Sequence, residues 1–199
     1  MPGFDKYLDE NSQHTPEWFE MAIERILQSA EPDRIGPLNS RFQFCAPFES
    51  GLSNEAWGRI RRAFLLAVSK EAGHDTQGVI ASVKDLIQKS IAGDPVDAAS
   101  WIEAQRLALN HKNAPAAMIA YNLSVASQRD DEHAGLAATM ELAIDAMLRL
   151  DEPHSRPSMT PKRESLELAR KARICSRLGH ALAGAFESEI ELSYKPNGN

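Results

Sequence analysis

Residues 53–68 read SNEAWGRIRRAFLLAV, and this stretch decides the fold class. Ser53 is a residue type that caps helix N-termini, and Glu55 places an acid in the first turn. Large apolar side chains then recur at the i, i+3, i+7 and i+11 spacing of a buried helical stripe: Trp57, Ile60, Phe64 and Val68. The stretch therefore predicts an amphipathic helix that packs into a core.

The same periodicity recurs along the chain between helix start and stop signals. Thr15-Pro16-Glu17 begins a predicted helix that reaches about Ala30. Further helices are predicted over 75–92, with Gly93 after the last turn, and over 94–110, 114–128, 131–150 and 161–192. No stretch alternates apolar and polar residues over a strand's length, so we expect no sheet. The prediction is all-α, with six or seven helices in a bundle or a short stack of antiparallel hairpins.

The 199 residues are about one domain's worth of chain. We expect a single helical domain with five parts: 1–52, a first helix and a long connector rich in Pro, Gly and Phe; 53–150, the helical core; 151–160, a linker; 161–192, a long C-terminal helix; and 193–199, a tail. The connector, EPDRIGPLNSRFQFCAPFESGLS, has little periodicity. It predicts an irregular loop held to the core by Phe42, Phe44 and Phe48.

Composition places the chain among folded proteins, with 43% hydrophobic and 25% charged residues. Cys45 and Cys175 are too few for a disulfide framework and are expected to be buried reduced thiols. The acidic start of the sequence lacks the apolar run of a signal peptide, and the longest apolar stretch, 63–68, is too short to cross a bilayer. We expect a cytoplasmic protein with no membrane span.

Charge is distributed unevenly along the sequence. The net charge of −6 argues against a general nucleic-acid coat, and residues 1–50 carry nine acids against four bases. In the predicted last helix the bases form a stripe, which comprises Arg163, Arg170 and Arg177 at heptad spacing, with Lys171 and Arg173 beside them. Leu168, Ala172, Cys175, Leu182 and Phe186 are expected on the opposite side. The stripe either pairs with the acidic N-terminal segment or meets an acidic protein partner or RNA.

Two further charge patterns need an explanation. The bases of the last helix precede Glu187, Glu189 and Glu191, an order that opposes the helix dipole. Three arginines also lie beside Trp57, namely Arg59, Arg61 and Arg62, and these we interpret as a solvated helix face.

Residues 105–113 read QRLALNHKN, with four residues between Arg106 and His111. The pair resembles the R-x4-6-H motif of the HEPN superfamily, helical proteins that often act as metal-independent ribonucleases. The resemblance implies proton transfer by His111 and stabilisation of the phosphorane charge by Arg106. Leu107 departs from the pattern, which usually has a polar residue there. Residues five apart lie about 140° apart around a helix, so the pair converges only beyond a helix end or across two subunits.

Two carboxylate–histidine pairs have the spacing used in helical di-iron bundles: Glu71 with His74, and Asp130 with His133. Those bundles need further bridging carboxylates, and none stands out, so we interpret both pairs as solvated helix-end residues. His74-Asp75 matches an HD-type phosphohydrolase dyad but lacks the apolar residues before it. No P-loop, nucleophile elbow, nucleotide-binding glycine pattern or zinc spacing occurs, so we expect neither a metal nor a cofactor.

Residues 93–147 resemble the alanine-rich helices of all-helical immunity proteins from bacterial polymorphic toxin systems, through G-D-P-V-D-A, A-P-A-A-M-I-A-Y and H-A-G-L-A-A-T-M. The resemblance implies a protein that binds and blocks a cognate toxin and has no catalytic residues. The leading hypothesis is a non-enzymatic interaction protein that neutralises or tethers a macromolecular partner. Its expected contact residues are the arginines of the stripe, together with Phe42, Phe44 and Phe48. The alternatives are a HEPN-like ribonuclease and a helical small subunit of a nucleoprotein complex. A homodimer is compatible with each of the three hypotheses.

Overall fold

The computed structural model describes residues 15–72, 78–128, 135–150 and 161–194. Within these ranges the chain forms eight α-helices and one 3-10 helix and no strand, so the all-α class is confirmed and the predicted number of helices is too low. The elements are α1 (Glu17–Ser29), α2 (Pro32–Cys45), η1 (Ala46–Gly51), α3 (Asn54–Glu71), α4 (Val79–Ala92), α5 (Ala98–Leu109), α6 (Ala114–Gln128), α7 (Gly135–Leu150) and α8 (Pro161–Tyr194).

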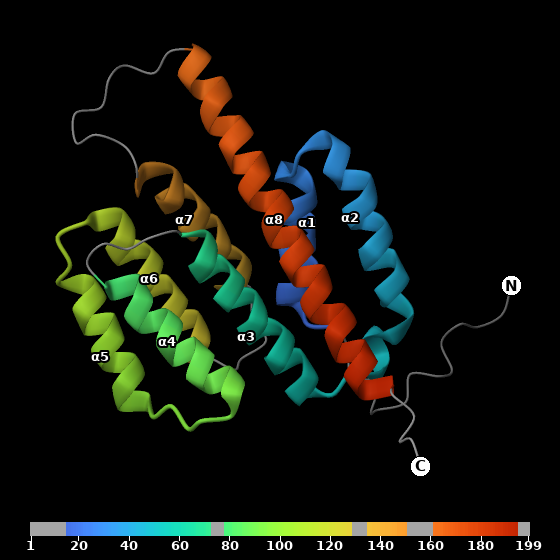
Figure 1. Ribbon diagram of the computed structural model, residues 1–199, viewed down its shortest axis with the longest axis horizontal. Coiled ribbons are helices and arrows are strands. Elements are labelled where there is room, and N and C mark those ends of the chain that lie inside the picture. The colour runs from blue at the N-terminus through green and yellow to red at the C-terminus, as the bar shows by residue number, and fades with distance from the viewer. Residues whose placement is uncertain (1–14, 73–77, 129–134, 151–160, 195–199) are drawn as a thin grey trace, which may run out of the picture.

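The long helix α8 runs across one side of the molecule, and α1, α2 and α3 pack along it (Figure 1). The other half consists of α4, α5, α6 and α7, and α6 contacts each of the other three helices. The contacts of α3 with α4 and of α1 with α7 join the two halves. Buried side chains from all eight helices form one continuous core.

Helix α3 forms as its sequence predicts. Ser53 Oγ accepts a hydrogen bond from the backbone N–H of Ala56 at 3.2 Å, which satisfies one of the free donors of the first turn. The predicted stripe of Trp57, Ile60, Phe64 and Val68 is buried. It packs mainly against α8, where the rings of Trp57 and Phe186 lie with centroids 5.4 Å apart.

The prediction of an irregular connector is wrong for residues 32–45, which form the regular helix α2. Pro32 lies in the first turn, where its missing N–H is not needed. Leu38, Phe42 and Cys45 follow at i, i+4 and i+7 and are all buried. This apolar period offsets the cost of Pro37 inside the helix, because packing against α8 outweighs intrinsic propensity.

In the middle of the chain, helices α4 and α5 begin later than predicted, and α4 begins at Val79, after Gly78 with φ +82°. Gly93 ends α4 with φ +84°, the left-handed conformation that suits glycine, as expected. Helix α5, however, begins at Ala98 and not at Asp94, because Asp97 is the residue that caps it. The Asp97 side chain accepts a hydrogen bond from the Ser100 N–H at 2.7 Å.

Gly179 lets α8 approach α1 and α2 closely. A Cβ built at this position lies 2.8 Å from Cγ2 of Ile26 and 3.0 Å from Cδ1 of Leu38, closer than carbon atoms pack. At Gly184, further along the same helix, the nearest atom is 3.7 Å away, which is an ordinary contact. The first glycine is therefore required by packing and the second is not.

We predict opposite effects of alanine at these two positions. Gly179→Ala lowers the free energy of unfolding by about 1–3 kcal/mol, because the added methyl overpacks the contact with Ile26 and Leu38. Gly184→Ala is the matched control and raises it by roughly 0.5–1 kcal/mol through helix propensity. Urea unfolding followed by circular dichroism measures both, and equal changes in the two variants would contradict the close approach.

Candidate functional site

Helix α8 has two parts. From Ile174 to Glu189 it contributes nine buried residues to the molecule. Its first residues, 161–173, include no buried side chain, and we call this segment the arm. The arm extends beyond the neighbouring ends of α1, α2 and α7 (Figure 1). Its 13 residues correspond to a length of about 20 Å.

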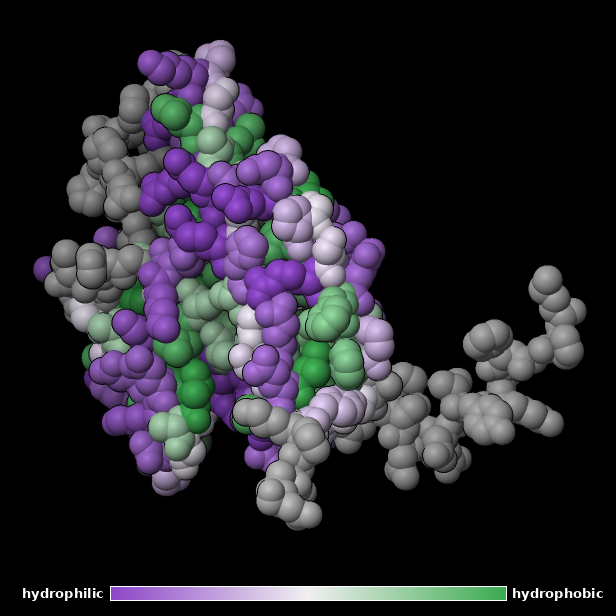
Figure 2. Space-filling view, turned by 45° about the vertical axis from the view of Figure 1, so that its right-hand side comes forward, coloured by the Kyte–Doolittle hydropathy of each residue, from purple (hydrophilic) through white to green (hydrophobic). Residues whose placement is uncertain are grey.

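The arm combines exposed leucines with basic residues. Leu166 and Leu168 are 61% and 62% exposed. The arm contains five basic and two acidic residues, in a chain whose net charge is −6. Hydrophobic and hydrophilic side chains accordingly intermingle at the upper end of the molecule (Figure 2). The prediction that Leu168 lies on the buried side is wrong, since the buried residues of α8 begin only at Ile174.

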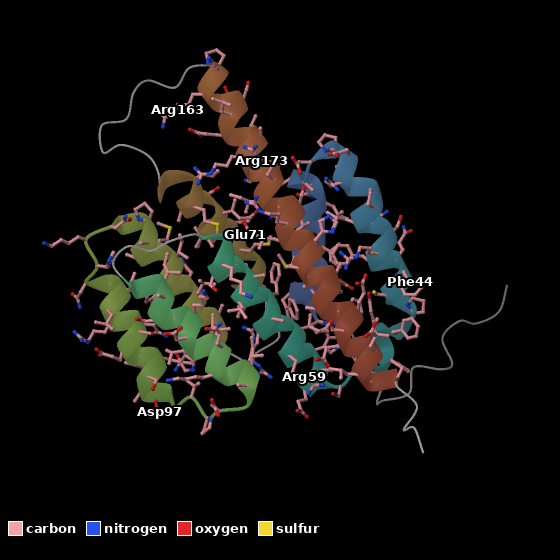
Figure 3. The ribbon with its side chains drawn as sticks, in the orientation of Figure 1. Phe44, Arg59, Glu71, Asp97, Arg163 and Arg173 are labelled. Carbon is pink, nitrogen blue, oxygen red and sulfur yellow. The ribbon has the colours of Figure 1, made fainter. Side chains whose placement is uncertain are left out.

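Several cations of the predicted stripe are paired within the chain. Arg163 bonds Glu167 at 3.1 Å, Lys171 lies 3.9 Å from Asp145 of α7, and Arg177 reaches Glu71 of α3 at 2.7 Å. For these three cations the acids come from α3, α7 and α8, not from residues 1–50. Arg170 also has an interaction partner. Arg173 is exposed on the arm, as is visible with Arg163 and Glu71 in Figure 3.

The acids in the last turns of α8 bind arginines of neighbouring helices. Glu187 accepts two hydrogen bonds from Arg41 of α2, at 2.8 and 2.6 Å, and these lower the pKa of the Glu187 carboxyl. Glu189 is buried and accepts two from Arg59 of α3, at 2.9 and 2.8 Å. Bidentate pairs of this kind are strong and directional. The charge order that opposes the helix dipole is thus explained by two pairs that hold α2 and α3 to α8.

The three phenylalanines predicted as contact residues have different environments. Phe42 is a core residue and is not accessible to a partner. Phe44 is 71% exposed and points outward from the end of α2, so its predicted role as an anchor is wrong (Figure 3). Phe48 is half-buried, and the centroid of its ring lies 5.2 Å from that of Tyr194 near the end of α8.

In the structure, the side chains of Arg106 and His111 contact different groups. Helix α5 ends at Leu109, so His111 does lie beyond its end, as the ribonuclease hypothesis requires. Arg106, however, is exposed and donates two hydrogen bonds to Glu103, at 2.7 and 2.6 Å. The Nδ1 atom of His111 lies 3.3 Å from the backbone of Asn113. No hydrogen bond within the described part of the chain joins the arginine to the histidine.

We predict that neither residue supports RNA cleavage. The variants Arg106→Ala and His111→Ala should match the wild type when each is incubated with single-stranded RNA in a metal chelator, because their side chains serve other contacts. Gel analysis of the RNA measures this. Metal-independent cleavage by the wild type that both variants lose would instead support the HEPN hypothesis.

The metal and thiol predictions fall partly within the described residues. His74, Asp75, Asp130 and His133 lie outside them, and Glu71 bonds Arg177. Three or more His, Cys, Asp or Glu side chains do not gather as a metal site anywhere in the described ranges. Cys45 and Cys175 are free and buried, as predicted, and burial raises the pKa of each thiol to about 11. None of the described helices combines the length and apolarity that a membrane span requires.

The arginines beside Trp57 do not form the solvated face that the sequence suggested. Arg59 pairs with Glu189, and Arg61 is only 9% exposed, with Nη2 donating to the Ala126 carbonyl oxygen at 2.6 Å. Arg62 is half-buried. The prediction fails because α3 is covered on more than one side: Arg59 reaches α8, Arg61 reaches α6, and the N-terminal turns border a cavity.

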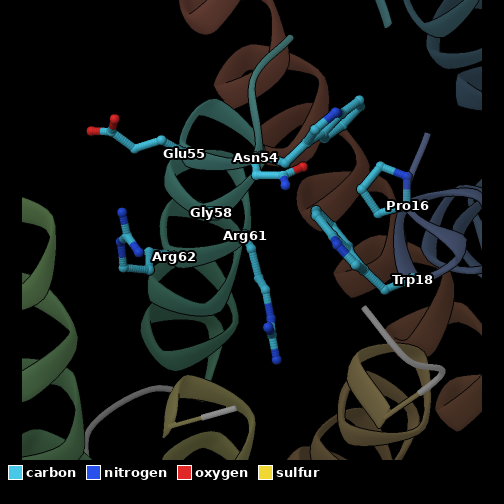
Figure 4. Close-up of a pocket in the computed structure, with 8 residues that line it drawn as sticks. Pro16, Trp18, Asn54, Glu55, Gly58, Arg61 and Arg62 are labelled. Carbon is cyan, nitrogen blue, oxygen red and sulfur yellow. The ribbon is translucent and has the colours of Figure 1, made fainter. Parts of the chain in front are cut away.

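This cavity lies between the N-terminal half of α3 and the start of α1 and has a volume of about 450 Å³. Its described lining comprises Pro16, Trp18, Asn54, Glu55, Trp57, Gly58, Arg61 and Arg62. Figure 4 shows Arg61 and Arg62 leaving α3 in different directions, with Pro16 and Trp18 facing that helix from α1. The sequence offered one signal for it, an arginine cluster at helical spacing from a tryptophan.

No protein-family model matches the sequence, and neither a curated protein nor a solved structure matches it. The function is therefore argued from the geometry of the arm and the cavity.

Proposed function

We propose that this protein is a cytoplasmic, non-catalytic interaction protein that neutralises or tethers an acidic protein partner by binding it through the arm of α8. The observation that carries the proposal is the exposure of Leu166 and Leu168 on a segment with no buried side chain. Both leucines present apolar surface to water on one projecting element, and burial of that surface would stabilise a complex. Burial against a partner explains them.

The arrangement of the two leucines defines the shape of the partner. Residues two apart lie about 200° apart around a helix, so Leu166 and Leu168 face nearly opposite sides of the arm. A partner that covers both must enclose the helix. A groove that covers only one face of a helix buries one of the two leucines, so the groove has to be deep enough to surround most of the arm.

The charge of the arm defines the chemistry of the partner. Five bases against two acids make the arm positive on an otherwise acidic chain, so an acidic rim around the groove complements it and accelerates association. RNA fits less well, because it leaves the two leucines exposed. A toxin held by an immunity protein is one partner of this kind, as the resemblance of residues 93–147 implies.

The experiment compares an arm variant with a matched control on the same helix. Leu166→Asp with Leu168→Asp removes the apolar contacts of the arm, and Leu192→Asp changes a leucine that is 63% exposed near the other end of α8. A partner captured from the source cell is identified, purified and titrated by calorimetry. The arm variant should bind it about 100-fold more weakly, since two buried leucines are lost, and the control should bind like the wild type.

Three outcomes would contradict the proposal. The first is equal affinity of the purified partner for the wild type and the arm variant. The second is a dimeric wild type that the arm variant converts to a monomer, because the leucines would then bury against a second copy. The third is tight, salt-sensitive binding of RNA through the arm, which would favour the nucleoprotein alternative.

A further inference from the structure

The cavity between α1 and α3 is lined by two kinds of surface. Pro16, Trp18 and Trp57 supply apolar and aromatic surface, and Asn54, Arg61 and Arg62 supply polar groups. Its volume of about 450 Å³ lies in the range of small-molecule sites, which are mostly apolar with a few polar groups that orient the ligand. The cavity therefore has the size and the surface of a ligand site.

Arg62 is the charged group that the fold leaves available to a ligand. Among the described residues, the buried Nε atom of Arg62 has no hydrogen-bond acceptor. Its Nη1 atom lies 3.4 Å from the position of a Cβ built on Gly58, so the guanidinium lies against the one residue of this turn that has no side chain. A half-buried guanidinium without an acid is a strong site for an anion, and its planar fork matches a carboxylate.

Trp57 contributes a second unused donor. Its side chain is 3% exposed and packs against the rings of Phe19 and Phe186 at 4.9 and 5.4 Å. The indole Nε1–H is buried and makes no hydrogen bond within the part of the chain that the structure describes. Buried tryptophan N–H groups usually have an acceptor, since leaving one unsatisfied is costly. A ligand with an acceptor on this side of the cavity satisfies the group.

We propose that this cavity binds a small carboxylic acid that has a planar ring and a second hydrogen-bond acceptor. The carboxylate pairs with Arg62, and the planar body extends toward Trp18 and Pro16, where the second acceptor receives the Trp57 N–H. Because Trp57 and Arg62 lie about 140° apart around α3, the ligand has to cross the turn at Gly58, which lines the cavity without a side chain. A singly charged carboxylate fits better than a phosphate, because Glu55 adds a negative charge at the lining and Arg61 already donates to Ala126.

The proposal is independent of the arm. The cavity lies at the N-terminal end of α3, whereas the basic stripe of α8 meets the other end of α3 through Arg177 and Glu71. An 18-residue helix is about 27 Å long, so the two surfaces are separate. Substitutions in the arm leave the cavity intact, and substitutions in the cavity leave the arm intact. A failed test of one proposal therefore does not contradict the other.

The test uses the indole N–H signals of the three tryptophans in a nitrogen-15 spectrum of the full chain. Trp18→Phe and Trp101→Phe assign the signals by removing one each. The probe is 4-hydroxyphenylacetate, an aromatic carboxylate whose hydroxyl oxygen is the second acceptor. It should move the Trp57 and Trp18 signals saturably and leave that of Trp101 on α5 in place. Binding on the order of millimolar is expected for a ligand with so few atoms.

The controls separate charge, acceptor and site. Arg62→Gln should weaken binding about tenfold, Arg62→Lys by less, and the matched surface variant Arg34→Gln not at all. The neutral amide 4-hydroxyphenylacetamide should also bind the wild type about tenfold more weakly, which tests the charge without any substitution. Phenylacetate, which lacks the second acceptor, should move the Trp57 signal less.

Several results would overturn the proposal. One is that the Trp57 signal does not move at the highest concentration at which the probe dissolves. A second is that the Arg62→Gln variant binds the probe, or the wild type binds the neutral amide, as tightly as the wild type binds the probe. A third is that inorganic phosphate moves the same signals as strongly as the carboxylate does.

A peptide that ends in tyrosine with a free carboxyl group identifies the source of the ligand. If the peptide binds more tightly than the free acid, the carboxylate belongs to a protein terminus, and if it binds more weakly, the carboxylate belongs to a metabolite.

Discussion

The fold depends on one aromatic contact, in which Phe19 of α1, Trp57 of α3 and Phe186 of α8 pack with ring centroids 4.9 to 5.4 Å apart. These rings come from three helices that are remote in sequence, so the contact fixes how the N-terminal, central and C-terminal segments meet. Trp18 and Phe42 extend it to the cavity wall and to α2. Because Trp57 is held by this packing and also lines the cavity, the core fixes the position of one wall of the candidate site.

The C-terminal two thirds of α8 are secured by shape and by charge. Gly179 allows a close approach to Ile26 and Leu38, and the pairs of Glu187 with Arg41 and Glu189 with Arg59 add directional bonds to α2 and α3. These pairs are partly exposed and bidentate, so they add geometric specificity as well as stability. With α8 anchored in this way, the arm has to extend past its neighbours. The proposed partner-binding surface is a consequence of how the rest of the helix is held.

The sequence predicts the helices well wherever apolar periodicity and capping agree. The buried stripe of α3, the glycine that ends α4 and the extent of α6 follow from such local signals. Helix α2 was missed because Pro37 and Gly36 masked the spacing of Leu38, Phe42 and Cys45, which only packing against α8 makes decisive. The site was less predictable. Whether an arginine lies in solvent, as Arg106 does, or is enclosed, as Arg61 is, depends on contacts between remote segments.

The division of α8 into an anchored part and an exposed arm is the central feature of this account, and residue-resolved amide hydrogen exchange of the free protein tests it most directly. The account predicts that residues 178–190 exchange only through openings close to global unfolding, because their side chains lie in the core. Residues 162–173 should exchange through local openings of far lower free energy, since nothing is buried there. Equally slow exchange along the whole helix would contradict the division, because it would require stabilising contacts along the arm.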